Sequence, residues 1–173
     1  HAAKIKKNFQ LDKKSQTSIE TKELIIEKII SNSLIKSFTL PNLIHGVMIT
    51  KSIKGQGYGI HIDNPYMPTG RSDLSFTLFL NSPEDYDGGE LCIQTINDTE
   101  EIKLSPGEII IYPSTKLHKV EQVKKGERYV CVGWIQSYVQ SNEDRNFLFG
   151  LDAGAKGLLA KYGRSDELDL IFQ

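Results

Sequence analysis

Two residues in the segment "YGIHIDNPYM" (58–67), His61 and Asp63, have side chains that can bind a metal ion. A single residue, Ile62, separates them. Side chains at positions i and i+2 of a β-strand project from the same face, so on a strand these two would point together. The alternative is a strand that carries a histidine and an aspartate by chance. A third ligand elsewhere in the chain would decide between the two interpretations.

The chain has four histidines, and His118 is the best candidate for the third ligand. It ends "SPGEIIIYPSTKLH", which is a tight turn, an apolar strand and a proline-broken loop, an order that can bring a side chain into the mouth of a small sandwich. His45 has no ligand-type neighbour and is interpreted as a structural histidine, and His1 is terminal. Two imidazoles and one carboxylate on one face of an octahedral ion leave three positions open, as in non-haem Fe(II) oxygenases. A structural zinc site prefers four closed ligands with more sulfur. We therefore predict an Fe(II) site made by His61, Asp63 and His118.

Arg128 could hold a ligand beside this site. It lies ten residues after His118, beyond the predicted "KKGE" turn and on the next strand. A guanidinium there could hold the far end of a dicarboxylate through a bidentate fork, while the 2-oxo acid end chelates the metal and O2 takes the last position. The alternative for Arg128 is a strand-end salt bridge with a surface glutamate.

The elements that must position these residues change along the chain. Residues 19–37 ("IETKELIIEKIISNSLIKS") predict one amphipathic helix, with Thr17 and Glu20 at capping-box spacing before it and an apolar stripe at helical spacing. That stripe consists of Ile19, Ile26, Ile30 and Leu34. About eight short strands follow, separated by "SPEDYDGGE", "NDTE", "SPGE", "PST" and "KKGE", and they indicate an antiparallel sandwich or barrel. Two helices are predicted at the end of the chain, at 143–163 and 165–173.

Composition gives the broad class. The 173 residues suit one domain (1–173), with a core at about 38–139 and a helical C-terminal segment at about 141–173. The formal net charge of −1 provides no basic field for nucleic acid or an anionic membrane, and no apolar run is long enough to span a membrane. Cys92 and Cys131 are interpreted as buried thiols in a reducing compartment, so a cytoplasmic location is expected. The stretch "KIKK" is interpreted as solvated surface.

The H-x-D pair, the distant histidine and the arginine about ten residues later resemble the Fe(II)/2-oxoglutarate-dependent dioxygenases. Longer segments resemble the PKHD-type hydroxylases of the prolyl-4-hydroxylase-like branch. These segments are "HAAKIKKNFQL", "YGIHIDNPYM", "RSDLSFTLFLNSPEDYDGGEL", "KLSPGEIIIYPSTKLHKVEQVKKGERYVCVGWIQSYV" and "DRNFLFGLD". Family members usually have more residues before the first of these and more helix after "DLIFQ", which leaves oligomer contacts open.

The resemblance implies a mainly β fold, a double-stranded β-helix (jelly-roll) core with an N-terminal helix and C-terminal helices. It implies His61, Asp63 and His118 as iron ligands and Arg128 as the 2-oxoglutarate anchor. The implied reaction couples decarboxylation of 2-oxoglutarate, to succinate and CO2, with hydroxylation of a small-molecule or peptidyl substrate by O2. The family is also associated with ascorbate as a reductant.

Several interpretations stay open at this point. Tyr58 could hydrogen-bond 2-oxoglutarate or be a core tyrosine. Arg71 and Asp73 could shape the substrate mouth or form a structural ion pair, and Trp134 is interpreted as core. A homo-oligomer is also left open. The alternative function is a cupin-like jelly roll that binds a metal or small molecule without oxygenase chemistry, since "SPGEIIIYPSTKLH" also fits the loose second cupin pattern. Against it, the first motif is H-x-D, where cupins usually bring two histidines and a glutamate.

Overall fold

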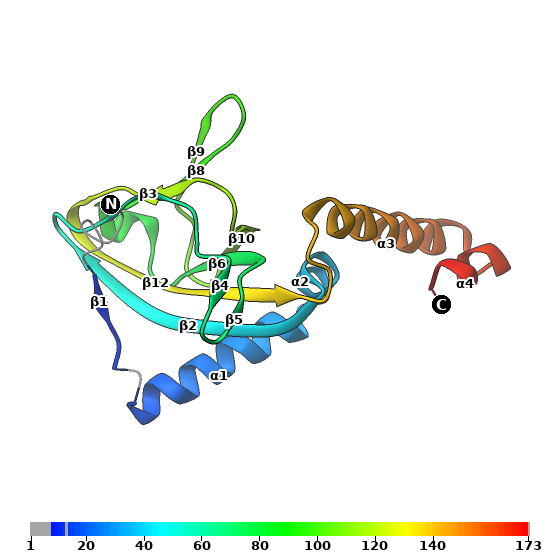
Figure 1. Cartoon of the computed structure of the whole chain (residues 1–173), viewed down its shortest axis with the longest axis horizontal. Helices are drawn as coiled ribbons and strands as arrows, with labels where there is room; N and C mark the ends of the chain where they lie inside the picture. Colours follow the sequence, from blue (N-terminus) through cyan, green and yellow to red (C-terminus); the bar gives the residue numbers. More distant parts are fainter. Residues whose placement is uncertain (1–7, 13, 173) are drawn as a thin grey trace.

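The computed structural model describes residues 8–12 and 14–172, and it consists of β-sheets with helices at both ends of the chain (Figure 1). His1 and the basic stretch "KIKK" lie outside the described residues. The prediction of a mainly β protein with flanking helices is confirmed.

The first helix, α1 (Gln16–Ser31), begins one turn earlier than the sequence predicts. Ser15 is its N-cap, and the Ser15 hydroxyl oxygen accepts a hydrogen bond from the backbone N–H of Ser18 at 3.2 Å. The predicted capping box of Thr17 and Glu20 is therefore wrong, because both residues lie inside the helix. A serine just outside the helix satisfies one of the N–H groups that the first turn leaves without a partner.

The single helix predicted over 19–37 is two helices, because Asn32 interrupts it. The Asn32 backbone N–H donates to Lys28 O at the end of α1. The Asn32 side-chain oxygen accepts from the backbone N–H of Ile35 at 3.0 Å and caps α2 (Ser33–Thr39). Asparagine is a preferred N-cap residue, and its side chain favours this turn over continuation of the helix.

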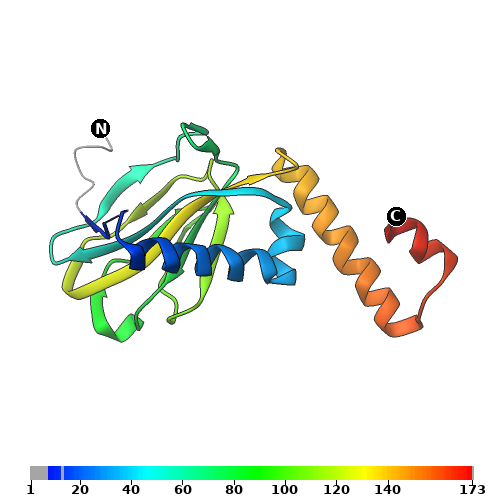
Figure 2. The same ribbon diagram turned by 90° about the horizontal axis from the view of Figure 1, so that it is seen from below.

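The face that α1 turns to the sheet differs from the predicted stripe. Ile25 and Ile29 are buried, whereas three of the four stripe residues are exposed by 40% or more: Ile19, Ile30 and Leu34. Only Ile26 of that stripe packs against the core. The break at Asn32 changes the helix direction, so one helical period cannot describe the whole segment. Figure 2 shows α1 lying along the outer face of the sheet that contains β2.

The larger sheet is antiparallel and carries the longest strands. Its order is β1-β2-β12-β6-β10, and β7 pairs with one end of β12. Its strands are β1 (Phe9–Gln10), β2 (Pro41–Ile53), β6 (Leu74–Phe79), β7 (Tyr86–Gly88), β10 (Ile109–Pro113) and β12 (Val123–Ser137).

The smaller sheet has the order β3-β11-β8-β9, and β4 and β5 form a separate hairpin. These strands are β3 (Tyr58–His61), β4 (Tyr66–Met67), β5 (Gly70–Arg71), β8 (Leu91–Gln94), β9 (Thr99–Ile102) and β11 (His118–Val120). Both sheets place strands that are far apart in sequence next to each other, such as β2 beside β12 and β3 beside β11, as the double-stranded β-helix requires. The sheets are not closed, so of the two predicted arrangements the sandwich is correct and the barrel is wrong.

The predicted "KKGE" turn is wrong, because β12 continues through it. The strand pairs there with β7, which comes from the "SPEDYDGGE" segment that the sequence interprets as a turn, after the short 3-10 helix η2 (Pro83–Asp85). The register shifts between Val123 and Lys125. At Gly126, φ is +75° and a Cβ atom would lie 2.1 Å from Asp85 O, so the irregular strand needs glycine there.

Two apolar clusters hold the sheets and helices together. One lies between the larger sheet and α1, and the other lies between the two sheets. Neighbouring residues of β12 divide between them: Cys131 packs in the first cluster and Val130 in the second. The alternation of side chains along a strand therefore gives β12 two buried faces.

Both cysteines are free and buried, as predicted for Cys92 and Cys131. Burial raises the pKa of the Cys92 thiol, and it raises the pKa of Cys131 to about 12. The reactive thiolate is therefore scarce at pH 8, and the side chains are also inaccessible. We expect neither thiol to react with iodoacetamide in the native protein at pH 8, and both to react in denaturant. Labelling of Cys131 under native conditions, detected by mass spectrometry, would contradict the packing described here.

The chain ends in two helices, α3 (Asn142–Tyr162) and α4 (Asp166–Phe172), close to the predicted positions. The Ser141 hydroxyl oxygen caps α3 by accepting from the backbone N–H of Asp144 at 3.1 Å. Figure 1 shows α3 extending away from the sheets, with α4 folded back beside it. None of the helices that the structure describes is long and apolar enough to span a membrane.

Candidate active site

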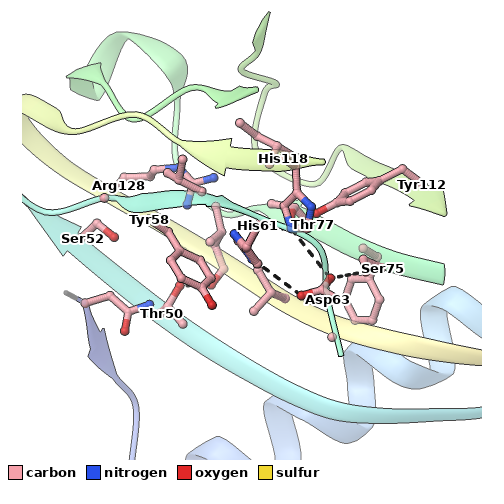
Figure 3. Close-up of a pocket in the computed structure, with 18 of the residues that line it drawn as sticks. Thr50, Ser52, Tyr58, His61, Asp63, Ser75, Thr77, Tyr112, His118 and Arg128 are labelled. Atoms are coloured by element: carbon pink, nitrogen blue, oxygen red, sulfur yellow. Dashed lines mark hydrogen bonds and ion pairs between the residues drawn. The ribbon is translucent and has the colours of Figure 1, made fainter. Parts of the chain in front are cut away.

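A pocket opens between the two sheets, and five of the predicted site residues line it: Tyr58, His61, Asp63, His118 and Arg128 (Figure 3). Its walls come from β2, β6, β10 and β12 of the larger sheet and from β3, β8 and β11 of the smaller one. The polar side chains among the lining residues include those of Thr50, Ser52, Tyr58, His61, Asp63, Ser75, Thr77, Tyr112, His118 and Arg128.

His61 and His118 face each other across neighbouring strands. They are direct partners in the antiparallel pairing of β3 with β11, and their ring centroids lie 4.2 Å apart. Each ring Nδ1 lies within hydrogen-bond distance of a backbone carbonyl two residues earlier: 2.8 Å to Gly59 O for His61 and 2.9 Å to Lys116 O for His118. A carbonyl oxygen only accepts, so each Nδ1 carries a proton, and in the neutral ring Nε2 is then the nitrogen with the lone pair. This is the tautomer in which a histidine can bind a metal through Nε2.

Asp63 completes the cluster, but not in the way that the spacing suggests. β3 ends at His61, so Asp63 lies beyond the strand and the same-strand argument for the pair is wrong. Its carboxylate nevertheless meets both rings. Asp63 Oδ1 lies 3.7 Å from His61 Nε2, and Oδ2 lies 3.7 Å from His118 Nε2. One ligand atom from each of the three residues lies within 4.8 Å of the other two.

Arg128 reaches the same pocket from β12 and is 4% exposed. Its guanidinium carbon lies 5.6 Å from the centre of the Phe79 ring. A Cβ atom at Gly89 would lie 3.0 Å from Arg128 Cδ, so glycine leaves room for the side chain. Burial lowers the pKa of the guanidinium. The salt bridge with a surface glutamate, the alternative for this residue, is not present among the described residues.

The Nε–H of Arg128 is buried, and among the described residues it has no hydrogen-bond partner. A buried cation with an unsatisfied donor is costly unless an anion or acceptor reaches it. Together with the two imidazole Nε2 atoms and the carboxylate, this buried donor fits a site for a divalent ion and an anionic ligand. One donor atom from each of the three residues lies within 4.8 Å of the other two, a grouping close enough for the three side chains to share one ion.

Tyr58 lies against this cluster. Its ring centroid is 3.8 Å from that of His61, and it lines the pocket. Burial, followed by the nearby negative charge of Asp63, raises the pKa of the Tyr58 hydroxyl. The hydroxyl therefore stays protonated at neutral pH and can donate a hydrogen bond.

Arg71 and Asp73 form a two-pronged ion pair away from the pocket. Arg71 Nε donates to Asp73 Oδ1 at 2.7 Å, and Arg71 Nη2 donates to Asp73 Oδ2 at 2.9 Å. Both residues also bond the backbone of Ser137 at the end of β12, through Arg71 Nη2 to Ser137 O and Ser137 N–H to Asp73 Oδ2. Neither lines the pocket. These contacts favour the structural alternative for this pair.

His45 is the structural histidine that the sequence predicts. It is 6% exposed, and its two ring nitrogens lie 2.9 Å from Thr69 Oγ1 and 3.0 Å from Arg71 O. Trp134 stacks on it with ring centroids 6.3 Å apart. Trp134 is only partly core, because it also lines the pocket.

Sequence reasoning missed several polar residues of the pocket. Ser75 and Thr77 are 3% and 4% exposed on β6, and Tyr112 is 7% exposed on β10. Burial raises the pKa of Tyr112, whose ring packs edge-to-face with that of His118, with the ring centroids 5.1 Å apart. The alternation of polar and apolar residues in "DLSFTLFLN" was the available signal, since its polar positions Ser75 and Thr77 face the pocket rather than solvent.

Comparisons with known proteins agree with this arrangement. Residues 47–136 match the model of the 2OG-Fe(II) oxygenase superfamily. A PKHD-type hydroxylase of Prochlorococcus marinus strain NATL1A is 80% identical over 173 residues, which are 100% of this chain and 78% of that protein. A second, from strain MIT 9211, is 64% identical over the same shares of the two chains.

Two solved structures share the fold. A prolyl hydroxylase of Trichoplax adhaerens, solved with a hypoxia inducible factor peptide fragment, has a TM-score of 0.57 and 20% identity over 83% of this chain and 67% of that one. A prolyl-4-hydroxylase of Pseudomonas putida has a TM-score of 0.55 and 18% identity over 76% and 72%. The family match favours the oxygenase over the cupin-like alternative. The chain therefore belongs to the 2OG-Fe(II) oxygenase superfamily, among its PKHD-type hydroxylases, and is a 2-oxoglutarate-dependent dioxygenase.

Proposed function

We propose that His61, Asp63 and His118 bind Fe(II) and that Arg128 binds the distal carboxylate of 2-oxoglutarate. The observation that carries this proposal is the convergence of the three donor residues in a pocket that also holds the buried guanidinium. When bound, Fe(II) supplies the redox chemistry that couples oxidation of 2-oxoglutarate by O2, to succinate and CO2, with hydroxylation of a second substrate.

The chain's own residues prepare this site in three ways. The carbonyls of Gly59 and Lys116 fix the Nδ1 protons, so both histidines present Nε2 to the ion. The two sheets bury Arg128 away from water, which strengthens its attraction for a carboxylate. Tyr58, beside His61, keeps its proton and is placed to donate a hydrogen bond to 2-oxoglutarate.

The substrate to be hydroxylated is proposed to be a free or peptidyl amino acid. Support comes from the relatives named hydroxylases and from the fold shared with prolyl hydroxylases, one of which was solved with a peptide. A substrate role for Arg71 and Asp73 has no support in their contacts. Ascorbate as the reductant and a homo-oligomer stay predictions. A cytoplasmic location is supported only by the two free, buried cysteines.

The reaction can be tested without knowing the substrate. Purified protein with Fe(II), 2-oxoglutarate, O2 and cell extract as the source of the second substrate is expected to form succinate, together with products heavier by about 16 Da, the mass of one oxygen atom. Mass spectrometry detects both products. Absence of succinate from protein shown to be folded and loaded with Fe(II) would contradict the proposed reaction.

Zinc provides a second test of the same proposal. Zn2+ has higher affinity than Fe(II) for most nitrogen and oxygen sites, so we expect it to compete for the three ligands. It has no redox chemistry and is expected to abolish succinate formation. The measurement is turnover at fixed Fe(II) with increasing Zn2+, followed by restoration with excess Fe(II). Full succinate formation by protein that contains only Zn2+ would contradict the proposed role of Fe(II).

A further inference from the structure

Asp63 lies outside any strand, so its position depends on specific hydrogen bonds. Its backbone N–H donates to Ser114 O at 3.1 Å. Its carboxylate atom Oδ2 accepts a hydrogen bond from the Ser75 hydroxyl at 2.5 Å, which Figure 3 shows as a dashed line. His61 and His118 are instead held by the pairing of β3 with β11. The carboxylate is therefore the member of the cluster that most needs an external support.

The direction of the hydrogen bonds around Ser75 follows from counting protons. Ser75 Oγ lies 2.7 Å from Ser114 Oγ, and either hydroxyl could be the donor in that contact. An ionised carboxylate can only accept, so the single hydroxyl proton of Ser75 goes to Asp63. Ser75 must then accept from Ser114. The result is a directed chain from the Ser114 hydroxyl to the Ser75 hydroxyl and on to Asp63 Oδ2.

Both serines are rigidly placed. Ser75 is 3% exposed and Ser114 is 1% exposed. Ser75 sits on β6 between two paired strands, opposite Trp134 of β12 and Tyr112 of β10. The Ser114 backbone N–H donates to Asp73 O at 3.1 Å, which ties the loop after β10 to the start of β6. A hydroxyl fixed in this way can hold a carboxylate in one orientation.

We propose that Ser75, supported by Ser114, is a positioning residue that makes Asp63 a one-oxygen metal ligand. The inference rests on the proposed function, in which Asp63 binds Fe(II). The hydrogen bond engages Oδ2 and holds the carboxylate plane, which favours binding of the ion through Oδ1. A carboxylate that bound through both oxygens would occupy one of the positions that 2-oxoglutarate and O2 require. Ser75 thus keeps the coordination sphere open for the co-substrates.

The test is an anaerobic titration of the Ser75→Ala protein with Fe(II), in which calorimetry measures the Fe(II) affinity. Loss of a residue that supports a metal ligand typically costs 10–100-fold in metal affinity, and we expect a loss of about that size. Ser72→Ala is the matched control. Ser72 is 4% exposed on the same segment, and within the described part of the chain its hydroxyl has no hydrogen-bond partner. Both variants remove a buried serine hydroxyl, but only the Ser75 hydroxyl contacts Asp63, the proposed metal ligand.

Two further variants separate the possible failures. Ser114→Ala keeps the Ser75 hydroxyl but removes its donor, so we expect a smaller loss of Fe(II) affinity than in Ser75→Ala. This variant also tests the proposal if Ser75→Ala does not fold. Asp63→Ala tests the ligand itself. If Asp63→Ala loses Fe(II) while Ser75→Ala stays within about twofold of Ser72→Ala, the positioning role is wrong and the metal site stands. If Asp63→Ala keeps full affinity, the proposed metal site is wrong.

Discussion

Replacing His118 by alanine is expected to abolish formation of succinate from 2-oxoglutarate while the protein remains folded. The substitution removes one of three proposed protein ligands and leaves only His61 and Asp63 to hold the ion. The fold should survive because His118 sits at the start of a short strand, and the two apolar clusters do not include it. The measurement is succinate formation at saturating Fe(II) and 2-oxoglutarate, with the melting temperature of each protein determined in the absence of metal.

His45→Gln is the control for this experiment. His45 is also a buried histidine, but its ring nitrogens contact Thr69 and Arg71 O rather than the cluster, and glutamine can still form hydrogen bonds. We expect it to lose some thermal stability and to keep turnover. A His118→Ala protein with the turnover of the original chain would show that His118 is not a ligand.

Replacing Arg128 by alanine is expected to weaken binding of 2-oxoglutarate by about tenfold to a thousandfold. Hydrogen bonds to charged groups contribute about 1.5–3 kcal/mol, and breaking a buried ion pair costs about 3–5 kcal/mol. Because about 1.4 kcal/mol is a factor of ten in affinity, losses of about 1.5–4 kcal/mol correspond to the stated range. Fe(II) affinity should change little, since Arg128 is not a proposed ligand. The measurement is an anaerobic titration of the Fe(II) protein with 2-oxoglutarate, followed through the visible charge-transfer band of the chelate.

Arg128→Lys is the matched variant, because it keeps the positive charge and removes the planar fork. We expect it to recover only part of the lost affinity. Equal affinity in Arg128→Ala and the original chain would refute the anchor role.

The residue types of His61, Asp63 and His118 mark them in the sequence as possible metal ligands, and the structure brings the three side chains together. The sequence was not sufficient to predict how Asp63 is held. The i, i+2 spacing to His61 suggested one strand, but β3 ends at His61 and Asp63 is supported from residues 12 and 51 positions further along the chain, Ser75 and Ser114. Contacts between such distant residues depend on which strands become neighbours, and local periodicity carries no information about that.

Local patterns also failed where a residue has two roles. The apolar residues recur at helical spacing on both sides of Asn32, which predicts that it lies inside a helix, yet its side chain caps a second helix. The sequence around Gly126 predicts a turn, yet β12 continues through this residue because β7 pairs with β12 there. By contrast, the strand positions of β6, β10 and the main part of β12 were predictable. Their apolar runs are set by burial against the two clusters.

The most direct test of the central claim is the stoichiometry of Fe(II) binding under anaerobic conditions. The original chain is expected to bind one Fe(II) per molecule, and addition of 2-oxoglutarate should then produce the charge-transfer band of a chelated 2-oxo acid. The His118→Ala protein, folded and at the same concentration, should show neither high-affinity Fe(II) binding nor the band. Wild-type Fe(II) affinity and an unchanged band in His118→Ala would contradict the assignment of the metal site to His61, Asp63 and His118.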